Sequence, residues 1–194
     1  MPDNTFDIKG GSNQILPNAH EANQFFIGDS AIQKGLSRMA RLREEIGKEV
    51  SEPTKDRIRF YETKLKGTKD MEEKLSDGGF KPSDIENAKR LKEYWAKEAF
   101  RTSDYPVIQE DNLNLYSRIA SEFDVYIMPM IEDEKPLRDV RQTLHEKIIS
   151  PIMDIFRKSG YNDDNLRYNY DHILGIIYYL TGNCHLNWKD YDNV

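Results

Sequence analysis

The segment that most constrains the fold is a long apolar stretch near the end of the chain, residues 164–188. It reads DNLRYNYDHILGIIYYLTGNCHLNW. Apolar side chains recur at three- and four-residue intervals and also fill neighbouring positions, so the segment predicts a helix that is apolar on nearly every face. A helix of this kind belongs in the middle of a core. Asp163 or Asp164 is the expected N-cap, and Gly182 with Asn183 is the expected helix end.

The residues after this helix are expected to fold back on the body, and this end of the chain is rich in tyrosine. Tyr rings bury area while their hydroxyl groups find polar partners, so they suit both cores and protein interfaces. We therefore treat as candidate contact residues the aromatic and polar side chains of this region and an aromatic pair near the N-terminus: Tyr168, Tyr170, Tyr179, His185, Trp188, Phe25 and Phe26.

Most of the preceding chain has the periodicity of amphipathic helices. The sequence predicts an all-α fold, a helical bundle of about six to seven helices, with a short N-terminal β-hairpin or extended arm. Ser83 to Glu86 is a predicted capping box at the start of a long helix that ends near Arg101. At Pro151 the predicted helix over about 137–158 either kinks, or Ser150 caps a new one.

Charge and turn residues divide the chain into three predicted regions. These are an N-terminal arm (1–29), hairpin or flexible docking segment; a charged helical region (30–104); and a C-terminal helical core domain (105–194). The net charge of the chain is −6. Acidic and basic residues balance through Asp104, so the negative charge lies in the third region and disfavours direct binding to nucleic acid there. A weaker hypothesis is nucleic-acid binding through the helices of 31–101, although their interleaved acids favour a solvated face.

The cysteine and hydropathy patterns bear on the compartment. Cys184 is the only cysteine, so no internal disulfide forms and the reducing cytoplasm is the expected location. No run reaches the roughly 18 apolar residues that span a bilayer, and the first residues lack the basic start of a secretory signal. We expect no contact with a membrane.

Motifs for nucleotide or metal chemistry are missing from the sequence. It contains neither GxxxxGK[ST] nor GxGxxG after a predicted strand, and His145-Glu146 departs from the zinc-protease pattern because Ile149 occupies the second histidine position. No cofactor and no metal site is predicted. The weak catalytic candidates are His172, Cys184 and His185, which would form a metal- or Cys/His-dependent hydrolase or nuclease site only if the fold brought them together. The favoured interpretation is structural.

A resemblance adds to this interpretation. The closing HILGIIYYLTGNCHLNWKDYDN resembles the end of the small C-terminal domains attached to effector or accessory proteins of ABC three-component systems, which are bacterial conflict and phage-defence operons. The matching features are the apolar helix of 172–180, the turn of 182–185 and Trp188, over the last third of the chain. No nuclease or protease module is recognisable before them. The resemblance implies protein partners, an SMC-like ATPase and an effector subunit, and no activity of the chain's own.

The residues and the resemblance point to one leading hypothesis. Charged long helices, an unusual N-terminal arm and an aromatic, acidic end without an assembled catalytic set are typical of an interaction module. The sequence therefore predicts a non-enzymatic adaptor or regulatory subunit of a bacterial antiviral defence complex. Nucleic acid would be met only indirectly, and self-association of the chain is left open.

Overall fold

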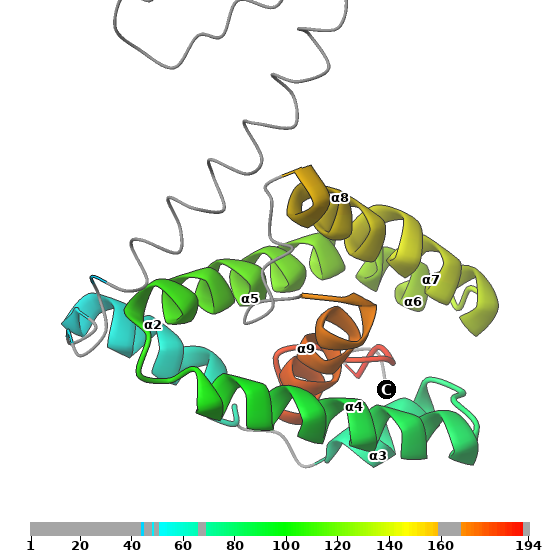
Figure 1. The fold of residues 1–194 in the computed structure, drawn as a ribbon. Helices are drawn as coiled ribbons and strands as arrows, with labels where there is room; N and C mark the ends of the chain where they lie inside the picture. The colour runs from blue at the N-terminus through cyan, green and yellow to red at the C-terminus, as the bar shows by residue number, and fades with distance from the viewer. Residues whose placement is uncertain (1–43, 45–47, 49–50, 66–68, 159–167, 192–194) are drawn as a thin grey trace, which may run out of the picture.

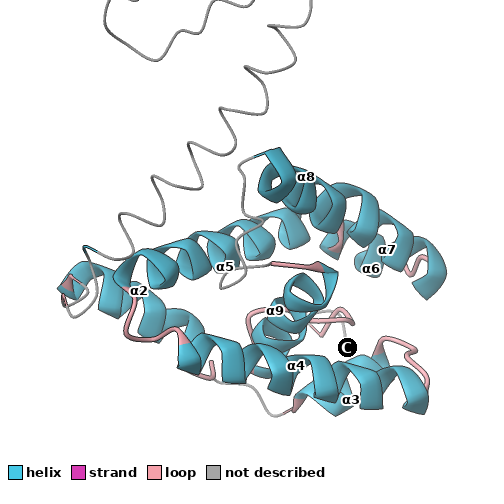
Figure 2. Ribbon diagram, viewed as in Figure 1, coloured by secondary structure: helices cyan, strands magenta, loops and turns pink. Residues whose placement is uncertain are grey.

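The computed structural model describes residues 44, 48, 51–65, 69–158 and 168–191. All regular elements within these residues are helical, which confirms the predicted all-α class (Figure 2). They are α2 (Glu52–Glu62), α3 (Met71–Asp77), α4 (Pro82–Arg101), α5 (Pro106–Tyr126), α6 (Met128–Glu132), α7 (Leu137–Leu144), the π-helical turn η1 (His145–Ile149), α8 (Ser150–Lys158) and α9 (Tyr170–Gly182). Since α7, η1 and α8 follow one another without a break, the described residues hold six longer helices and the single turn α6.

Helix α9 lies in the middle of the bundle, as its apolar pattern predicts. Figure 1 shows it between α4 on one side and α5 with the α7–α8 rod on the other. Four of its apolar side chains have no exposed surface: Ile173, Ile176, Ile177 and Leu180. Burying a side chain of this size stabilises a fold by about 1.5 to 3 kcal/mol, so α9 anchors the larger of the two hydrophobic clusters among the described residues.

The contact between α9 and α4 depends on Gly175. A Cβ atom at position 175 would lie 2.7 Å from the Leu91 carbonyl oxygen and 2.8 Å from the Trp95 Cβ atom, both on α4. The two helix backbones therefore approach more closely than any other residue at this position allows. Close approach lets the Trp95 side chain, 2% exposed, reach across to α5, where its indole N–H donates to the Tyr116 hydroxyl at 3.1 Å.

The chain after α9 returns to the core, which confirms the predicted fold-back of the tail. Leu186 and Trp188 are both buried. The Trp188 indole N–H donates to the Thr181 hydroxyl at 3.1 Å, and this hydroxyl donates to the Ile177 carbonyl at 2.9 Å. Gly78, at the end of α3, leaves space for this tail, because a Cβ there would lie 2.7 Å from the Trp188 Cβ.

Two helix starts differ from the sequence predictions. The predicted capping box at Ser83 is wrong: α4 begins at Pro82 after Lys81, with no side-chain cap, because proline fits a first helical turn without needing its missing N–H. The predicted caps at Asp163 or Asp164 are also wrong, since Asn169 is the N-cap of α9. Capping boxes form instead at Asn169 and at Asp70, the N-cap of α3.

Of the two outcomes predicted at Pro151, a new cap at Ser150 is wrong, because η1 and α8 follow one another without a break. Ser150 has helical backbone angles, φ −62° and ψ −45°, and its hydroxyl lies 3.3 Å from His145 Nδ1. A wider π-helical turn, residues 145–149, precedes Ser150 and Pro151. Proline has no backbone N–H to donate to the preceding turn, which accounts for the wider turn there. The rod consequently continues to Lys158.

Several sequence predictions concern residues outside the described ranges. The N-terminal hairpin or arm of 1–29, with Phe25 and Phe26, is among them, as is nearly all of the predicted helix over 30–50. The domain boundary after residue 104 stays a prediction, and helices from both sides of it share the large cluster. No helix in the described part of the chain is long and apolar enough to cross a membrane.

We predict that Gly175→Ala destabilises the protein although alanine favours helices. Overpacking against the Leu91 backbone costs about 1 to 3 kcal/mol, against a helix-propensity gain of about 0.5 to 1 kcal/mol. The matched control is Gly182→Ala on the same helix, whose Cβ would meet only the flexible end of Lys92. Urea unfolding followed by circular dichroism should show a lower free energy of unfolding for Gly175→Ala. Equal stability of the two variants would contradict the proposed close approach.

Candidate functional site

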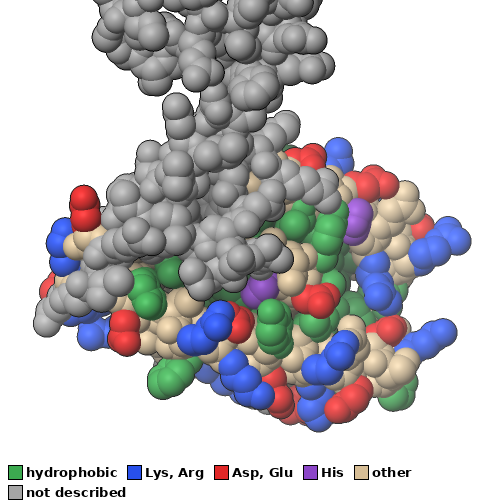
Figure 3. Space-filling view, viewed as in Figure 1, with side chains coloured by type: hydrophobic (Ala, Val, Ile, Leu, Met, Phe, Trp, Pro, Cys, Tyr) green, Lys and Arg blue, Asp and Glu red, His purple; other side chains and the backbone are tan. Residues whose placement is uncertain are grey.

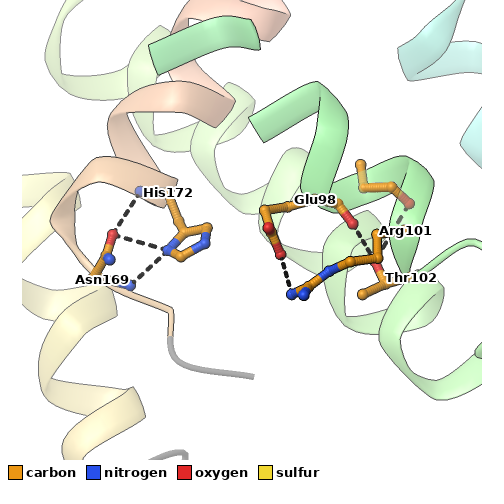
Figure 4. Close-up of polar contacts among 6 residues, drawn as sticks. Glu98, Arg101, Thr102, Asn169 and His172 are labelled. Atoms are coloured by element: carbon orange, nitrogen blue, oxygen red, sulfur yellow. Dashed lines mark hydrogen bonds and ion pairs between the residues drawn. The ribbon is translucent and has the colours of Figure 1, made fainter. Parts of the chain in front are cut away.

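The N-terminal end of α9 is held by a reciprocal pair of hydrogen bonds between Asn169 and His172 (Figure 4). The His172 backbone N–H donates to the Asn169 side-chain oxygen at 3.0 Å, and the Asn169 backbone N–H donates to His172 Nδ1 at 3.1 Å. The same Nδ1 atom lies 2.9 Å from the Asn169 side-chain oxygen, to which it can donate only when the ring proton is on Nδ1. His172 therefore occupies the place that Glu or Gln has in a standard capping box, and its imidazole serves the helix start.

The rest of the His172 ring is enclosed by aromatic side chains. Tyr94 lies 5.0 Å away, Tyr168 6.0 Å and Trp95 6.1 Å, measured between ring centroids. This burial lowers the pKa of His172 below its ordinary value of 6.5, while the nearby carboxylates of Glu98 and Asp171 act in the opposite direction.

The polar side chains nearest to His172 on α4 are already paired with each other. Figure 4 shows Glu98 and Arg101 on α4, facing the end of α9. Arg101 donates to the Glu98 carboxylate at 2.6 Å, and the Thr102 hydroxyl donates to the Glu98 carbonyl at 2.8 Å. The positive charge of Arg101 adds to the lowering of the His172 pKa. The neutral imidazole is thus favoured at this end of α9.

The C-terminal end of α9 is a docking point for α2. The Asn183 side-chain N–H donates to the Tyr61 carbonyl at 3.0 Å, and the Leu65 backbone N–H donates to the Asn183 carbonyl at 3.0 Å. Cys184 follows with a left-handed backbone, φ 64°, and its Sγ lies 3.9 Å from the Lys69 carbonyl. The turn of 182–185 therefore joins the segment before α3 to the core helix.

His185 completes this joint from a half-buried position. Its ring centroid lies 5.1 Å from that of Phe60 and 5.2 Å from that of Tyr61. Its Nε2 is buried and makes no hydrogen bond with the residues that the structure describes. Burial lowers the pKa of His185, the carbonyls of Phe60, Tyr61 and Thr63 oppose this, and the charge of Lys74 adds to it.

The three weak catalytic candidates do not meet. His172 lies in the first turn of α9, whereas Cys184 and His185 follow its last residue, Gly182. About 15 Å of helix separates the two ends at a rise of about 1.5 Å per residue. Within the described ranges, no three His, Cys, Asp or Glu side chains are grouped so as to hold a metal ion.

The predicted contact residues near α9 differ in how much of each is reachable. Trp188 is buried, and Tyr168 donates its hydroxyl proton to the Asn112 side chain at 2.6 Å. Tyr179 is half-buried and stacks on Tyr116 with 6.0 Å between centroids. Tyr170 is 38% exposed and stacks on His145, with 5.9 Å between centroids and 2° between planes. Of these side chains, Tyr170 offers the most open surface.

Sequence reasoning missed several exposed apolar side chains. Tyr94 on α4 is 39% exposed, beside His172, and Phe100 near the end of the same helix is 83% exposed. Their positions outside the buried stripe of Ala88, Leu91 and Trp95 were a usable signal, because an aromatic residue on a polar face has no core to enter. Figure 3 shows hydrophobic side chains reaching the surface between charged groups on the face that it presents.

We predict that stability falls as the pH drops from about 7.5 to about 5. Both His172 and His185 have lowered pKa values, so the unfolded chain binds more protons in this range and protonation favours unfolding. The variant His172→Gln/His185→Gln should show a flatter dependence, because Gln keeps the capping position and does not titrate. Urea titrations at several pH values test this. The desolvated Glu62 has a raised pKa and acts in the opposite sense, equally in both proteins. If the free energy of unfolding falls equally with pH in the wild-type chain and the variant, His172 and His185 are not the source of the pH dependence.

Comparison with known proteins identifies the family to which this arrangement of helices belongs. A family model described as C-terminal domain 9 of the ABC-three component (ABC-3C) systems matches residues 70–188, more than half of the chain. The match begins at the capping residue of α3 and ends at Trp188, so it includes α4, α9 and the returning tail. No match was found among curated proteins or among solved structures. The chain belongs to the family of C-terminal domain 9 of the ABC-three component systems.

Proposed function

We propose that this chain is a non-enzymatic adaptor or regulatory subunit of a multi-component bacterial antiviral defence complex, and that it acts through protein–protein contacts. Membership in the domain family of a three-component system supports a role beside other components. The proposed partners are an SMC-like ATPase and an effector subunit, with nucleic acid met only through them. The single cysteine fits a cytoplasmic complex.

The observation that carries the proposal is the exposure of aromatic rings around the start of α9. Tyr94 and Tyr170 lie on helices that also build the core, α4 and α9, and each is more than one-third exposed. The Tyr94 ring packs against His172, and the Tyr170 ring packs against His145, so each ring is held in place before any partner binds. Fixed aromatic rings bind partners with little loss of side-chain entropy, and Tyr is enriched among the residues that dominate interface energies.

The polar chemistry around α9 supports a contact role over the alternative of a hydrolase or nuclease. His172 is used in the helix cap, and His185 lies between the rings of α2 at the opposite end of α9. Cys184 contacts a backbone carbonyl, and the carboxylate of Glu98 is paired with Arg101. His172, Cys184 and Glu98 thus each have a local structural partner.

We predict that the double variant Tyr94→Ser/Tyr170→Ser copurifies more weakly with the other components of the system. Loss of two central aromatic contacts typically weakens binding by at least about tenfold. The matched control is Tyr126→Ser at the end of α5, which removes a ring of similar exposure, 42%, away from α9. The components are coexpressed and the tagged chain is recovered under native conditions. Equal recovery by the double variant and the control would rule out this surface.

We also predict that deletion of residues 1–29 abolishes copurification, while Cys184→Ala leaves it intact. The deletion removes Phe25 and Phe26, which we propose as partner contacts. Removing the Cys184 thiol takes away only a weak contact with the Lys69 carbonyl. Circular dichroism of the shortened chain establishes that its helices are retained. Undiminished recovery of the components by the shortened chain would exclude the arm as a contact.

A further inference from the structure

Helix α2 is attached to the bundle differently from the other described helices, apart from the single turn α6. None of its residues is buried, whereas α3, α4, α5, α7 and α9 each bury at least two. It also precedes the family domain, which begins at residue 70. In Figure 1, α2 lies at one edge of the bundle beside the start of α5. The buried residues of the large core cluster all lie outside α2, and Tyr61 is the residue of α2 that packs against them.

The surface under α2 is nonetheless shaped to receive a helix end. Tyr61 packs between the rings of Tyr116 and His185, at 5.8 and 5.2 Å between centroids. The Asn183 side chain donates to the Tyr61 carbonyl, one of the last carbonyls of α2 that lack a partner within the helix. These receiving residues, Tyr116, Asn183 and His185, all lie within the family domain. We call them, with Tyr179, the α2 docking site.

Two ion pairs within α2 add little to its hold on the body. They join Lys55 to Glu52 and Arg59 to Asp56, connect residues of the same helix and are mostly exposed. Such pairs stabilise a helix by only a few tenths of a kcal/mol and do not attach it to the body. Phe60, which packs edge-on against Tyr61, is 53% exposed. The ring contacts of Phe60 and Tyr61 and two hydrogen bonds with Asn183 hold the C-terminal end of α2 and the residues just after it. A helix held in this way opens more easily than one with a buried stripe.

From this geometry we propose that α2 is a displaceable ligand held in cis, and that the α2 docking site receives a helix of another component in its place. The incoming helix carries two adjacent aromatic residues in its last turn, as α2 does with Phe60 and Tyr61. One ring enters the space between Tyr116 and His185, and a terminal carbonyl accepts the Asn183 N–H. This use of the site by another component rests on the proposed function. The release of α2 from the site does not rest on the proposed function, so the exchange of α2 and the binding of another component can be disproved separately.

A peptide of residues 51–65, labelled at its N-terminus, tests the exchange by fluorescence anisotropy with the full chain. In the wild-type chain the site is occupied. Ile58→Pro breaks α2, since proline inside a helix costs about 3 kcal/mol or more, and leaves the core helices unchanged. We expect the peptide to bind the Ile58→Pro chain at least about tenfold more tightly than the wild-type chain, because the tethered helix no longer competes. Equal binding to both chains, or no binding to either, overturns the proposal.

Two matched peptides and one protein variant define the contacts. The Tyr61→Ala peptide should lose binding, whereas the Arg57→Ala peptide, changed at an exposed position, should keep it. Asn183→Ala combined with Ile58→Pro should weaken binding by about fivefold, since one hydrogen bond is lost. Binding that ignores Tyr61 overturns the assignment of the site. A wild-type chain that dimerises through exchange of α2 assigns the site to a second copy and overturns the partner.

A second measurement uses only the unaltered chain and so does not depend on any variant folding. Brief trypsin digestion should cut after Arg57 and Arg59 of α2 well before it cuts after Arg90 and Lys97 of α4, although all four side chains are exposed. Cleavage requires local opening of the helix, which is easier where no side chain is buried. Mass spectrometry of the early fragments gives the order. Simultaneous cutting of α2 and α4 overturns the proposal.

Discussion

The close crossing of α9 over α4 is the contact on which the rest of this structure depends. At Gly175 the two backbones meet with no side chain between them, and the Trp95 indole fills the space beside them. The Trp95 indole N–H also donates to the Tyr116 hydroxyl on α5. Gly175 and Trp95 together therefore position α4, α5 and α9. The tail and α3 are then added through Trp188, Thr181 and Gly78. A core of this kind needs an apolar helix that has partners on all sides.

The polar groups around α9 chiefly hold its two ends in place. Asn169 and His172 satisfy backbone donors at the first turn. At the other end the buried Lys74 donates to the Thr181 carbonyl at 3.3 Å, where a positive charge also suits the helix dipole. Asn183 and His185 then face α2. We therefore propose that the exposed aromatic rings, rather than the titratable side chains, are the groups that contact other components.

The fold could be predicted from the sequence where the hydrophobic period was long and unambiguous. The apolar pattern of residues 172–180 predicted a central helix, and Trp188 predicted a returning tail; both are present. The caps were harder, because Ser83 satisfies the capping pattern while the helix begins at Pro82, two residues before the start that a cap at Ser83 predicts. The proximity of Asn183 to Tyr61 could not be predicted, since no local pattern encodes a contact between residues more than one hundred positions apart. The exposure of Phe100 could have been predicted, because periodicity places it outside the buried stripe of α4.

The central claim is that α9 is the innermost element of the domain and opens only when the whole core opens. Native-state amide hydrogen exchange at increasing urea concentrations tests it directly. The account predicts that the amides of residues 176–180 exchange with the same free energy, and the same dependence on urea, as global unfolding. Exchange of these amides through a local opening, at a lower free energy than the amides of α4, would contradict it.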